Sequence, residues 1–182
     1  MEKLRNLIWY LAGRLFLILA IASVCTVTFY YAMNASNIQI VLKDGMARRA
    51  QVIMMEEKAS ELNKFFQSSY LQRDQNLQIA LDGQSPYICY NIRGIDHRLK
   101  MTWMWCWPWQ TVARAEFTET IPRIDGRVKP QYSATASALY GEDYESPPRW
   151  QGGKYSATLV KENGQWHIRS IALVELVEED AR

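Results

Sequence analysis

Residues 15–33 read LFLILAIASVCTVTFYYAM, an uncharged and largely apolar run near the N-terminus. At 1.5 Å per residue, a helix of this length spans about 28 Å, which matches the hydrocarbon thickness of a bilayer. Aromatic pairs flank the run, with Trp9 and Tyr10 before it and Tyr30 and Tyr31 at its end. Such rings settle at headgroup depth. The stretch therefore predicts a transmembrane helix whose partner is membrane lipid.

The basic residues near this run predict its orientation. Lys3, Arg5 and Arg14 precede it, whereas the first base after it is Lys43. Positively charged flanks stay on the cytoplasmic side of a membrane. We therefore expect residues 1–14 to form a cytoplasmic tail and the rest of the chain to fold outside the cytoplasmic membrane.

A cleaved signal peptide is the main alternative to a permanent anchor. Its apolar core would have only about 7–15 residues and would end at a small-residue cleavage site. The run here is longer, and Ala22, Ser23 and Val24 before Cys25 make a poor lipoprotein cleavage site because valine is bulky. We therefore expect an uncleaved, single-pass anchor.

Composition and charge limit the classes of function. The 182-residue chain has a formal net charge of +2, and acids and bases balance beyond the apolar run. Proteins that bind nucleic acids need a surplus of Lys and Arg on one face, so nucleic acid is not an expected partner. The length leaves room for one ordinary domain of about 100–150 residues beside the anchor.

The cysteines leave two alternatives open. Cys25 lies within the apolar run, so only Cys89 and Cys106 belong to the outer domain. These two either form a disulfide in an oxidising exterior or stay free as buried thiols. No Cys-x-x-Cys motif or His/Cys cluster occurs. We therefore expect neither a metal nor a cofactor.

Two helices are expected after the anchor. Apolar residues recur at helical spacing in a membrane-proximal helix over residues 34–57. These residues are Ile38, Val41, Leu42, Met46, Ala50, Val52 and Ile53. Asp44, Arg48 and Arg49 suit the solvated face of this helix. A second helix with its own apolar stripe is expected over residues 58–74.

Turn signals in residues 76–86 end the helical part, and the pattern then predicts strands. We expect strands at residues 87–92, 97–109, 111–121 and 132–140, then a hairpin over residues 154–175. Residues 122–130 are a predicted connection, and residues 141–153 are a predicted loop. In the hairpin, Asn163 and Gly164 supply the positive φ angles of a tight turn.

Helices followed by strands are typical of an α+β domain. We expect two helices packed on a curved antiparallel sheet, in an extracytoplasmic domain over residues 58–177. A disordered tail is expected at residues 178–182 because acids and no apolar run occupy it.

This order of elements, closed by GGKYSATLVKENGQWHIRSI at residues 152–171, resembles the nuclear transport factor 2 superfamily. Members of that superfamily have a cone-shaped sheet that wraps around N-terminal helices. The resemblance covers residues 38–175, and it implies that Trp166 and Ile168 pack into the core. The same cone hosts enzymes, ligand carriers and scaffolds, so the fold alone does not decide the function.

Together with the single N-terminal span, the predicted fold is similar to bitopic scaffold subunits of bacterial type IV secretion and conjugation machines. It is also similar to related Gram-positive conjugation and sporulation envelope proteins. Those subunits are not enzymes, and their outer domains contact other components of the assembly. The resemblance therefore implies a non-enzymatic scaffold whose partners are other envelope subunits or copies of itself.

Catalytic candidates are few. Enzymes of this superfamily place an Asp, sometimes with a His, inside the cone, and such proton transfer needs a group within hydrogen-bond reach of the substrate. Asp96 and His97 are adjacent on a predicted strand and so point to opposite faces. We expect His97 at a solvated strand start and His167 facing outward. No nucleophile elbow or phosphate loop occurs, so no catalytic residue is predicted.

Four tryptophans alternate along one predicted strand, at positions 103, 105, 107 and 109. Buried, they would fill much of the core; exposed, they would mark a partner surface. We expect Trp103 and Trp105 inside, with Trp107 and Trp109 at an interface. Tyr144 and Trp150, in the loop at residues 141–153, are the other expected contact residues.

The leading hypothesis is a membrane-anchored scaffold of the bacterial cell envelope, and the alternative is a membrane-tethered small-molecule binding or catalytic protein. The interior of the domain discriminates between them. A core filled by Trp and Phe favours the scaffold, whereas an open cavity that holds Asp96 or His97 favours the alternative.

Overall fold

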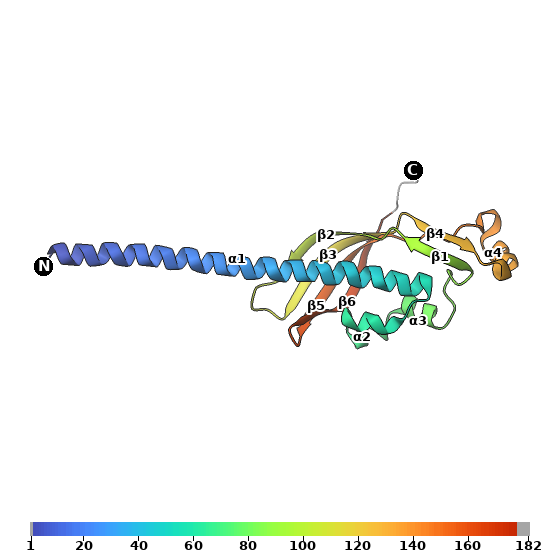
Figure 1. The fold of residues 1–182 in the computed structure, drawn as a ribbon, viewed down its shortest axis with the longest axis horizontal. Coiled ribbons are helices and arrows are strands. Elements are labelled where there is room, and N and C mark those ends of the chain that lie inside the picture. The colour runs from blue at the N-terminus through green and yellow to red at the C-terminus, as the bar shows by residue number, and fades with distance from the viewer. Residues whose placement is uncertain (1, 178–182) are drawn as a thin grey trace.

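The computed structural model describes residues 2–177 and shows a domain built around the C-terminal half of one long helix (Figure 1). Helix α1 runs without interruption from Glu2 to Met55, a length of about 80 Å. The transmembrane and membrane-proximal helices expected as separate elements are therefore one element, because residues 34–37 contain no Pro or Gly that would break it. The predicted tail at residues 178–182 lies outside the described residues.

The two halves of α1 have different surroundings. All side chains of residues 5–30 are exposed, whereas Asn34, Ile38, Leu42 and Met46 are buried in the domain. The most apolar part of the helix has a mean hydropathy of 2.1, and none of it is buried inside the protein. This helix is long and apolar enough to cross a membrane.

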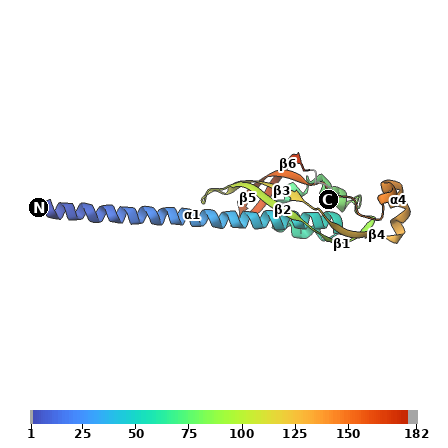
Figure 2. The ribbon, with the colours of Figure 1, turned by 90° about the horizontal axis from the view of Figure 1, so that it is seen from above.

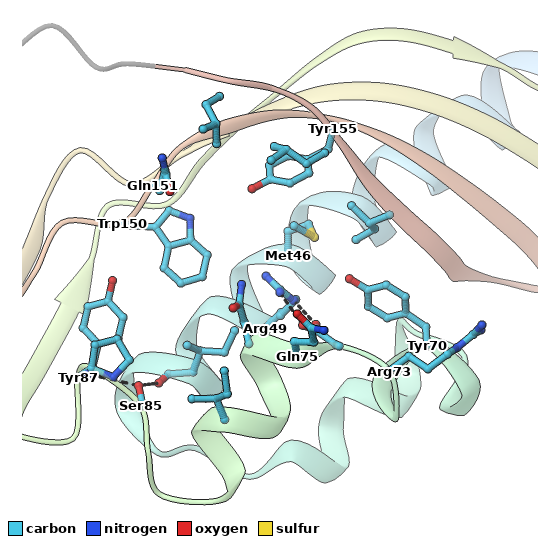
Figure 3. A pocket seen from close by; sticks show the side chains of 18 residues that line it. Met46, Arg49, Tyr70, Arg73, Gln75, Ser85, Tyr87, Trp150, Gln151 and Tyr155 are labelled. Carbon is cyan, nitrogen blue, oxygen red and sulfur yellow. Dashed lines mark hydrogen bonds and ion pairs between the residues drawn. The ribbon is translucent and has the colours of Figure 1, made fainter.

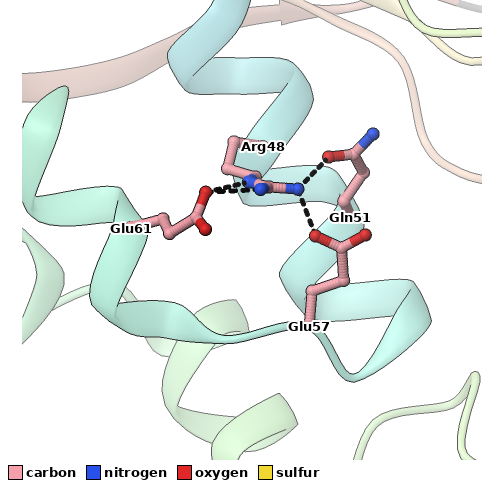
Figure 4. Close-up of polar contacts among 4 residues, drawn as sticks. All are labelled: Arg48, Gln51, Glu57 and Glu61. Atoms are coloured by element: carbon pink, nitrogen blue, oxygen red, sulfur yellow. Dashed lines mark hydrogen bonds and ion pairs between the residues drawn. The ribbon is translucent and has the colours of Figure 1, made fainter.

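Polar contacts around Arg48 stabilise the turn after α1 (Figure 4). The Arg48 Nε donates to Glu61 Oε2 at 3.0 Å, and its Nη1 donates to Gln51 Oε1 at 3.0 Å and also binds Glu57. The hydrogen bond between Arg48 and Glu61 raises the pKa of Arg48 and lowers the pKa of Glu61. The polar residues that follow Met55 therefore end the helix, as their sequence predicts.

The prediction of a single second helix over residues 58–74 is wrong. The chain forms a 3-10 helix η1 (Ala59–Lys64) and two short helices, α2 (Ser68–Leu71) and α3 (Gln75–Leu81). Between η1 and α2, the Ile168 N–H donates to Phe65 O at 2.7 Å and the Gln67 N–H donates to Ile168 O at 2.9 Å. These bonds to a strand hold the chain extended there. Helix α3 replaces predicted turns because Asp74 caps it, accepting from the Leu77 N–H at 3.3 Å.

The strands form two antiparallel sheets. One has the order β2-β3-β5-β6, with β2 (Arg98–Trp105), β3 (Val112–Thr120), β5 (Gly153–Glu162) and β6 (Gln165–Leu176). The other pairs β1 (Tyr90–Ile95) with β4 (Ile124–Val128). The Asp96 N–H donates to Arg123 O at 2.8 Å between the two sheets. Thus β1–β2 and β3–β4 are the arms of one long hairpin, which makes the expected connection at residues 122–130 a strand.

The strand expected at residues 132–140 is instead helix α4 (Ser133–Tyr140), which lies between the 3-10 turns η2 (Pro130–Tyr132) and η3 (Gly141–Asp143). Pro130 starts the helical turn, a position where its fixed φ angle is favourable. The alanines at alternate positions of this segment also favour a helix. Their helix propensity outweighs the apolar alternation that suggested a strand.

The C-terminal hairpin is confirmed. Strands β5 and β6 pair on either side of Asn163 and Gly164, whose φ angles are +50° and +82°. Trp166 and Ile168 are buried, as the resemblance implied. Helix α1 contacts β1, β2, β6, η1 and α3, and Figure 2 shows the strands beside its C-terminal half. Mixed helices and antiparallel sheets confirm the α+β class.

Candidate functional site

The four tryptophans of the predicted row all lie at the surface. Trp103 and Trp105, which we expected inside, are 48% and 47% exposed. A β-bulge interrupts the pairing of β2 and β3 between Met101 and Trp103. The bulge shifts the alternation, so that Met101, Met104 and Cys106 point inward and the indoles point outward. This expectation was wrong because sequence alternation cannot locate a bulge.

Trp107 and Trp109 lie in the loop that follows β2, and we name the four indoles of residues 103, 105, 107 and 109 the tryptophan cluster. The Trp107 ring packs edge-on against Trp105 and stacks on Trp109, with 5.2 Å between ring centroids in each pair. The loop is closed from within, because the Gln110 N–H donates to Trp107 O at 3.0 Å and the Trp107 N–H donates to Gln110 Oε1 at 3.1 Å. It therefore holds the exposed rings in place.

The tryptophan cluster lies where the apolar half of α1 ends. The Asn34 Nδ2 donates to Pro108 O at 3.4 Å, and the Tyr31 hydroxyl donates to Met104 O at 3.5 Å. In Figures 1 and 2 the β2–β3 loop is the part of the domain that reaches farthest toward the N-terminus of α1. A shallow groove of about 900 Å³ is lined by three of the indoles and by the exposed Arg114.

Tyr144 and Trp150 lie away from this cluster. Both are half-buried, and the Trp150 ring packs 6.5 Å from Tyr87. Trp150 lines a cavity together with Ile53, which is 19 residues beyond Asn34 on α1, or about 28 Å along the helix axis. The structure therefore places the expected contact residues at two ends of the domain.

That cavity, of about 640 Å³, lies between α1, the short helices and strands β5 and β6 (Figure 3). Trp150 and Tyr70 lie on either side of it, with Arg49 between them. The Arg49 Nε and Nη2 donate to the two carboxylate oxygens of Asp74 at 2.5 and 2.9 Å, and both side chains are buried. Burial alone would lower the pKa of Arg49, but the hydrogen bonds and charge of Asp74 outweigh it and raise that pKa. Burial also raises the pKa of Tyr70 to about 12.

Sequence reasoning missed the buried ion pair, because it assigned Arg49 to a solvated face. A signal was present. Arg49 lies three residues after Met46 and four before Ile53, so it falls on the buried face of the helix. Asp74 carried a second signal, since it precedes a short apolar run as a helix N-cap does.

A second buried polar pair links the β1–β2 connection to β3. The His97 Nε2 lies 2.9 Å from Glu119 Oε1, and the two side chains are 6% and 1% exposed. The expectation of a solvated His97 is therefore wrong, because Glu119 offers it a partner inside the sheet. The other carboxylate oxygen, Oε2, is buried and has no hydrogen-bond partner among the described residues.

The other catalytic candidates remain separate from the cavity. Asp96 and His97 form no dyad, since Asp96 pairs with Arg98 at 2.5 Å. Neither Asp96 nor His97 lines the cavity of Arg49. His167, between buried neighbours on β6, is half-buried. The interior thus holds large aromatic side chains, such as Phe66 and Phe117, together with two polar pairs.

The structure distinguishes between the alternatives for the cysteines. Cys89 and Cys106 are both free and buried. Burial raises the pKa of the Cys106 thiol, which keeps it in the unreactive protonated form. Within residues 2–177, no group of three or more His, Cys, Asp or Glu side chains is placed to hold a metal ion.

Comparison of the chain with protein-family models, with curated proteins and with solved structures finds no match. The resemblance to the nuclear transport factor 2 superfamily therefore stays a prediction, and the function is argued from the geometry.

Proposed function

We propose that this protein is a non-enzymatic, membrane-anchored scaffold or assembly subunit of a bacterial cell-envelope complex. The observation that carries the proposal is helix α1, whose exposed apolar half continues without a break into the core of the domain. A helix shared in this way couples the domain firmly to its anchor. Such coupling suits a subunit that must present its domain in a fixed position at the membrane surface.

The buried polar pairs also support a non-enzymatic role. Arg49 is bound by Asp74, which in addition caps α3, and His97 is bound by Glu119. A general acid or base must reach the reacting atoms of a substrate. These groups are instead engaged with one another, as expected of pairs that fix the packing of a domain.

The location outside the cytoplasm is supported by the bases that precede the apolar run. The envelope setting is supported by the resemblance to bitopic scaffold subunits. The surface that we assign to partner subunits is the end of the domain that lies farthest from the N-terminus of α1 (Figure 1). It includes Leu139 of α4, whose side chain is 66% exposed, and Tyr144, which follows η3.

Site-specific crosslinking of the full-length protein in bacterial membranes tests this proposal. A photoreactive amino acid at Leu139 is expected to give adducts of defined mass, which mass spectrometry identifies as a second copy or as another envelope protein. The same amino acid at Ser170, an exposed position on β6, is the matched control. Absence of protein adducts at Leu139, or the same adducts at both positions, would contradict the proposed surface.

The orientation of the chain in the membrane is tested by adding protease to cells whose outer membrane or cell wall has been made permeable. The proposal requires digestion of the domain while the inner membrane is intact, with a membrane-bound fragment left behind. Protection of the domain until the inner membrane is lysed would contradict it.

A membrane-tethered small-molecule binding protein is the second candidate, and the cavity of Arg49 favours it. Its volume of about 640 Å³ lies within the range of about 300–1,000 Å³ that ligand sites occupy. Arg49 is engaged by Asp74, but the exposed Arg73 also lines the cavity. Its guanidinium and the phenol rings of the lining suit a small anionic aromatic molecule. Ile79 lines the cavity, so we expect the larger side chain of Ile79→Trp to narrow it.

Thermal unfolding of the detergent-solubilised protein with a set of aromatic carboxylates tests this second function. We expect a higher Tm in the wild type and no rise in Ile79→Trp. Leu81→Trp, on the same helix but outside the cavity lining, is the control that should keep the rise. An unchanged wild-type Tm across the set would count against the cavity as a binding site.

A further inference from the structure

We propose that the tryptophan cluster lies in the headgroup region of the same bilayer that α1 crosses, so that the domain contacts the membrane at a second place. The inference rests on the proposed function in one respect, namely that residues 15–33 span the membrane. It assigns lipid as the partner of Trp107 and Trp109, which the sequence analysis expected to contact another protein.

The depth of the cluster follows from its bonds to α1. Asn34 is the first residue after the apolar run, and its side chain binds the Pro108 carbonyl at 3.4 Å. Tyr31 lies one turn earlier and binds the Met104 carbonyl at 3.5 Å. If residues 15–33 lie in the hydrocarbon, these positions lie at its boundary, because one helical turn rises only about 5.4 Å. The β2–β3 loop is therefore held at headgroup depth.

The chemistry of the cluster suits that depth. Trp and Tyr are the side chains that concentrate at membrane interfaces, because each has a large apolar ring and a polar group. Three of the four indoles are at least 47% exposed, and Trp109 reaches 69%. Arg114 lines the same groove as Trp103, Trp105 and Trp109. A guanidinium beside aromatic rings can bind a lipid phosphate while the rings enter the acyl boundary.

The exposed apolar surface around the loop is continuous with that of α1. Phe29, Tyr30 and Met33 on the helix and Val112 at the start of β3 are also exposed. Exposed apolar patches of this kind mark protein or membrane contacts. Here the patch adjoins the proposed membrane-spanning segment, whereas the end of the domain with α4 points away from it (Figure 1). The position favours lipid over a protein partner.

A second contact has a mechanical consequence. A single helix leaves a domain free to tilt with the helix. A rigid loop that inserts beside the helix removes part of this freedom. The tryptophan cluster would then fix the direction in which the far end of the domain is presented.

The test uses the full chain with Trp9→Phe, which removes the tryptophan at the opposite end of the span. The protein is reconstituted in phosphatidylcholine vesicles in which part of the lipid carries bromine atoms close to the headgroup end of the acyl chains. Bromine quenches only those indoles that contact the lipid. We expect brominated lipid to lower the tryptophan emission, and we expect most of this loss to disappear when all four indoles of the tryptophan cluster are also replaced by phenylalanine.

The matched control is Trp150→Phe in the same background, which should keep the quenching because Trp150 lies near the other end of the packed part of α1. Cooperative thermal unfolding of each variant shows that it is folded. Emission that brominated lipid leaves unchanged and that water-soluble acrylamide quenches would overturn the inference, and would show instead that the loop is free for a protein partner.

Alkaline carbonate extraction of the same vesicles separates the two proposals. Protein that stays with the lipid but shows no bromine quenching contradicts the membrane contact of the loop and leaves the anchor intact. Protein that carbonate releases contradicts the anchor, and with it the inference that depends on it.

Discussion

Arg49 and Asp74 carry opposite charges inside the domain, where each stabilises the other. Removing one partner of a buried pair leaves an uncompensated charge, which costs about 3–5 kcal/mol. We therefore expect Arg49→Met to lower the free energy of unfolding by that amount, measured by denaturant titration of the full chain in detergent. In the double variant with Asp74→Asn, which keeps an N-cap for α3, part of the loss should be recovered. Equal losses in the single and double variants would show that the pair is not coupled.

We expect a loss of stability at alkaline pH because of two tyrosines, the half-buried Tyr70 and the buried Tyr87. Burial raises the pKa of Tyr70 and of Tyr87 to about 12, above the value of about 10 in an unfolded chain. Between these values the folded state binds more protons than the unfolded state, so stability falls as pH rises. The free energy of unfolding should be constant with respect to these groups below pH of about 10 and should fall between about 10 and 12. Tyr70→Phe and Tyr87→Phe should each reduce this slope, and an unchanged slope in both variants would contradict this expectation.

Single residues were the least predictable part of the molecule. Arg49 could have been found from its place on the apolar face of α1, since its spacing from Met46 and Ile53 is visible in the sequence. The partner of His97 could not, because Glu119 lies 22 residues away and meets it only through the pairing of β2 with β3. Contacts that depend on strand register have no local signal.

At Gly45, helix α1 packs closely on Phe65 and on Ile168 of the C-terminal hairpin. A Cβ atom at Gly45 would lie 3.0 Å from the Phe65 Cβ and 3.2 Å from the Ile168 Cδ1. We expect Gly45→Val to destabilise the domain by about 1–3 kcal/mol through overpacking, although it removes a helix glycine. Gly13→Val, on the same helix with nothing within 4 Å, should not destabilise it. Equal unfolding midpoints for the two variants would contradict this packing.

Elements with a strong local pattern were predictable, and the others were decided by packing. The hairpin followed from Asn163 and Gly164, whose positive φ angles suit a tight turn. A strand was expected where helix α4 lies, since its short run of small residues has no strong local pattern. Trp103 and Trp105 were expected in the core, but the β-bulge after Met101 reverses the faces of β2. Nothing in the composition of the strand signals this bulge.

The account of the whole molecule depends on the continuity of α1 between the apolar half and the core. Ser36 lies on α1 just beyond the apolar run, and its side chain is exposed. We expect Ser36→Pro to lower the free energy of unfolding by about 3 kcal/mol or more and to open a new protease site nearby, while carbonate-resistant membrane binding persists. Ser36→Ala is the control and should behave as the wild type. Protease resistance of Ser36→Pro equal to that of the wild type would show that continuity is not needed.

The central claim, that lipid surrounds residues 15–33, is tested most directly at Cys25. This thiol is exposed on α1, whereas Cys89 and Cys106 are buried in the domain, so a water-soluble maleimide reports on Cys25 in the folded protein. In membrane fragments open at both faces, we predict no labelling of the wild type until a denaturing detergent is added, and prompt labelling of Ser36→Cys. Labelling of Cys25 in the intact fragments at the rate of Ser36→Cys would place this half of the helix in water and contradict the claim.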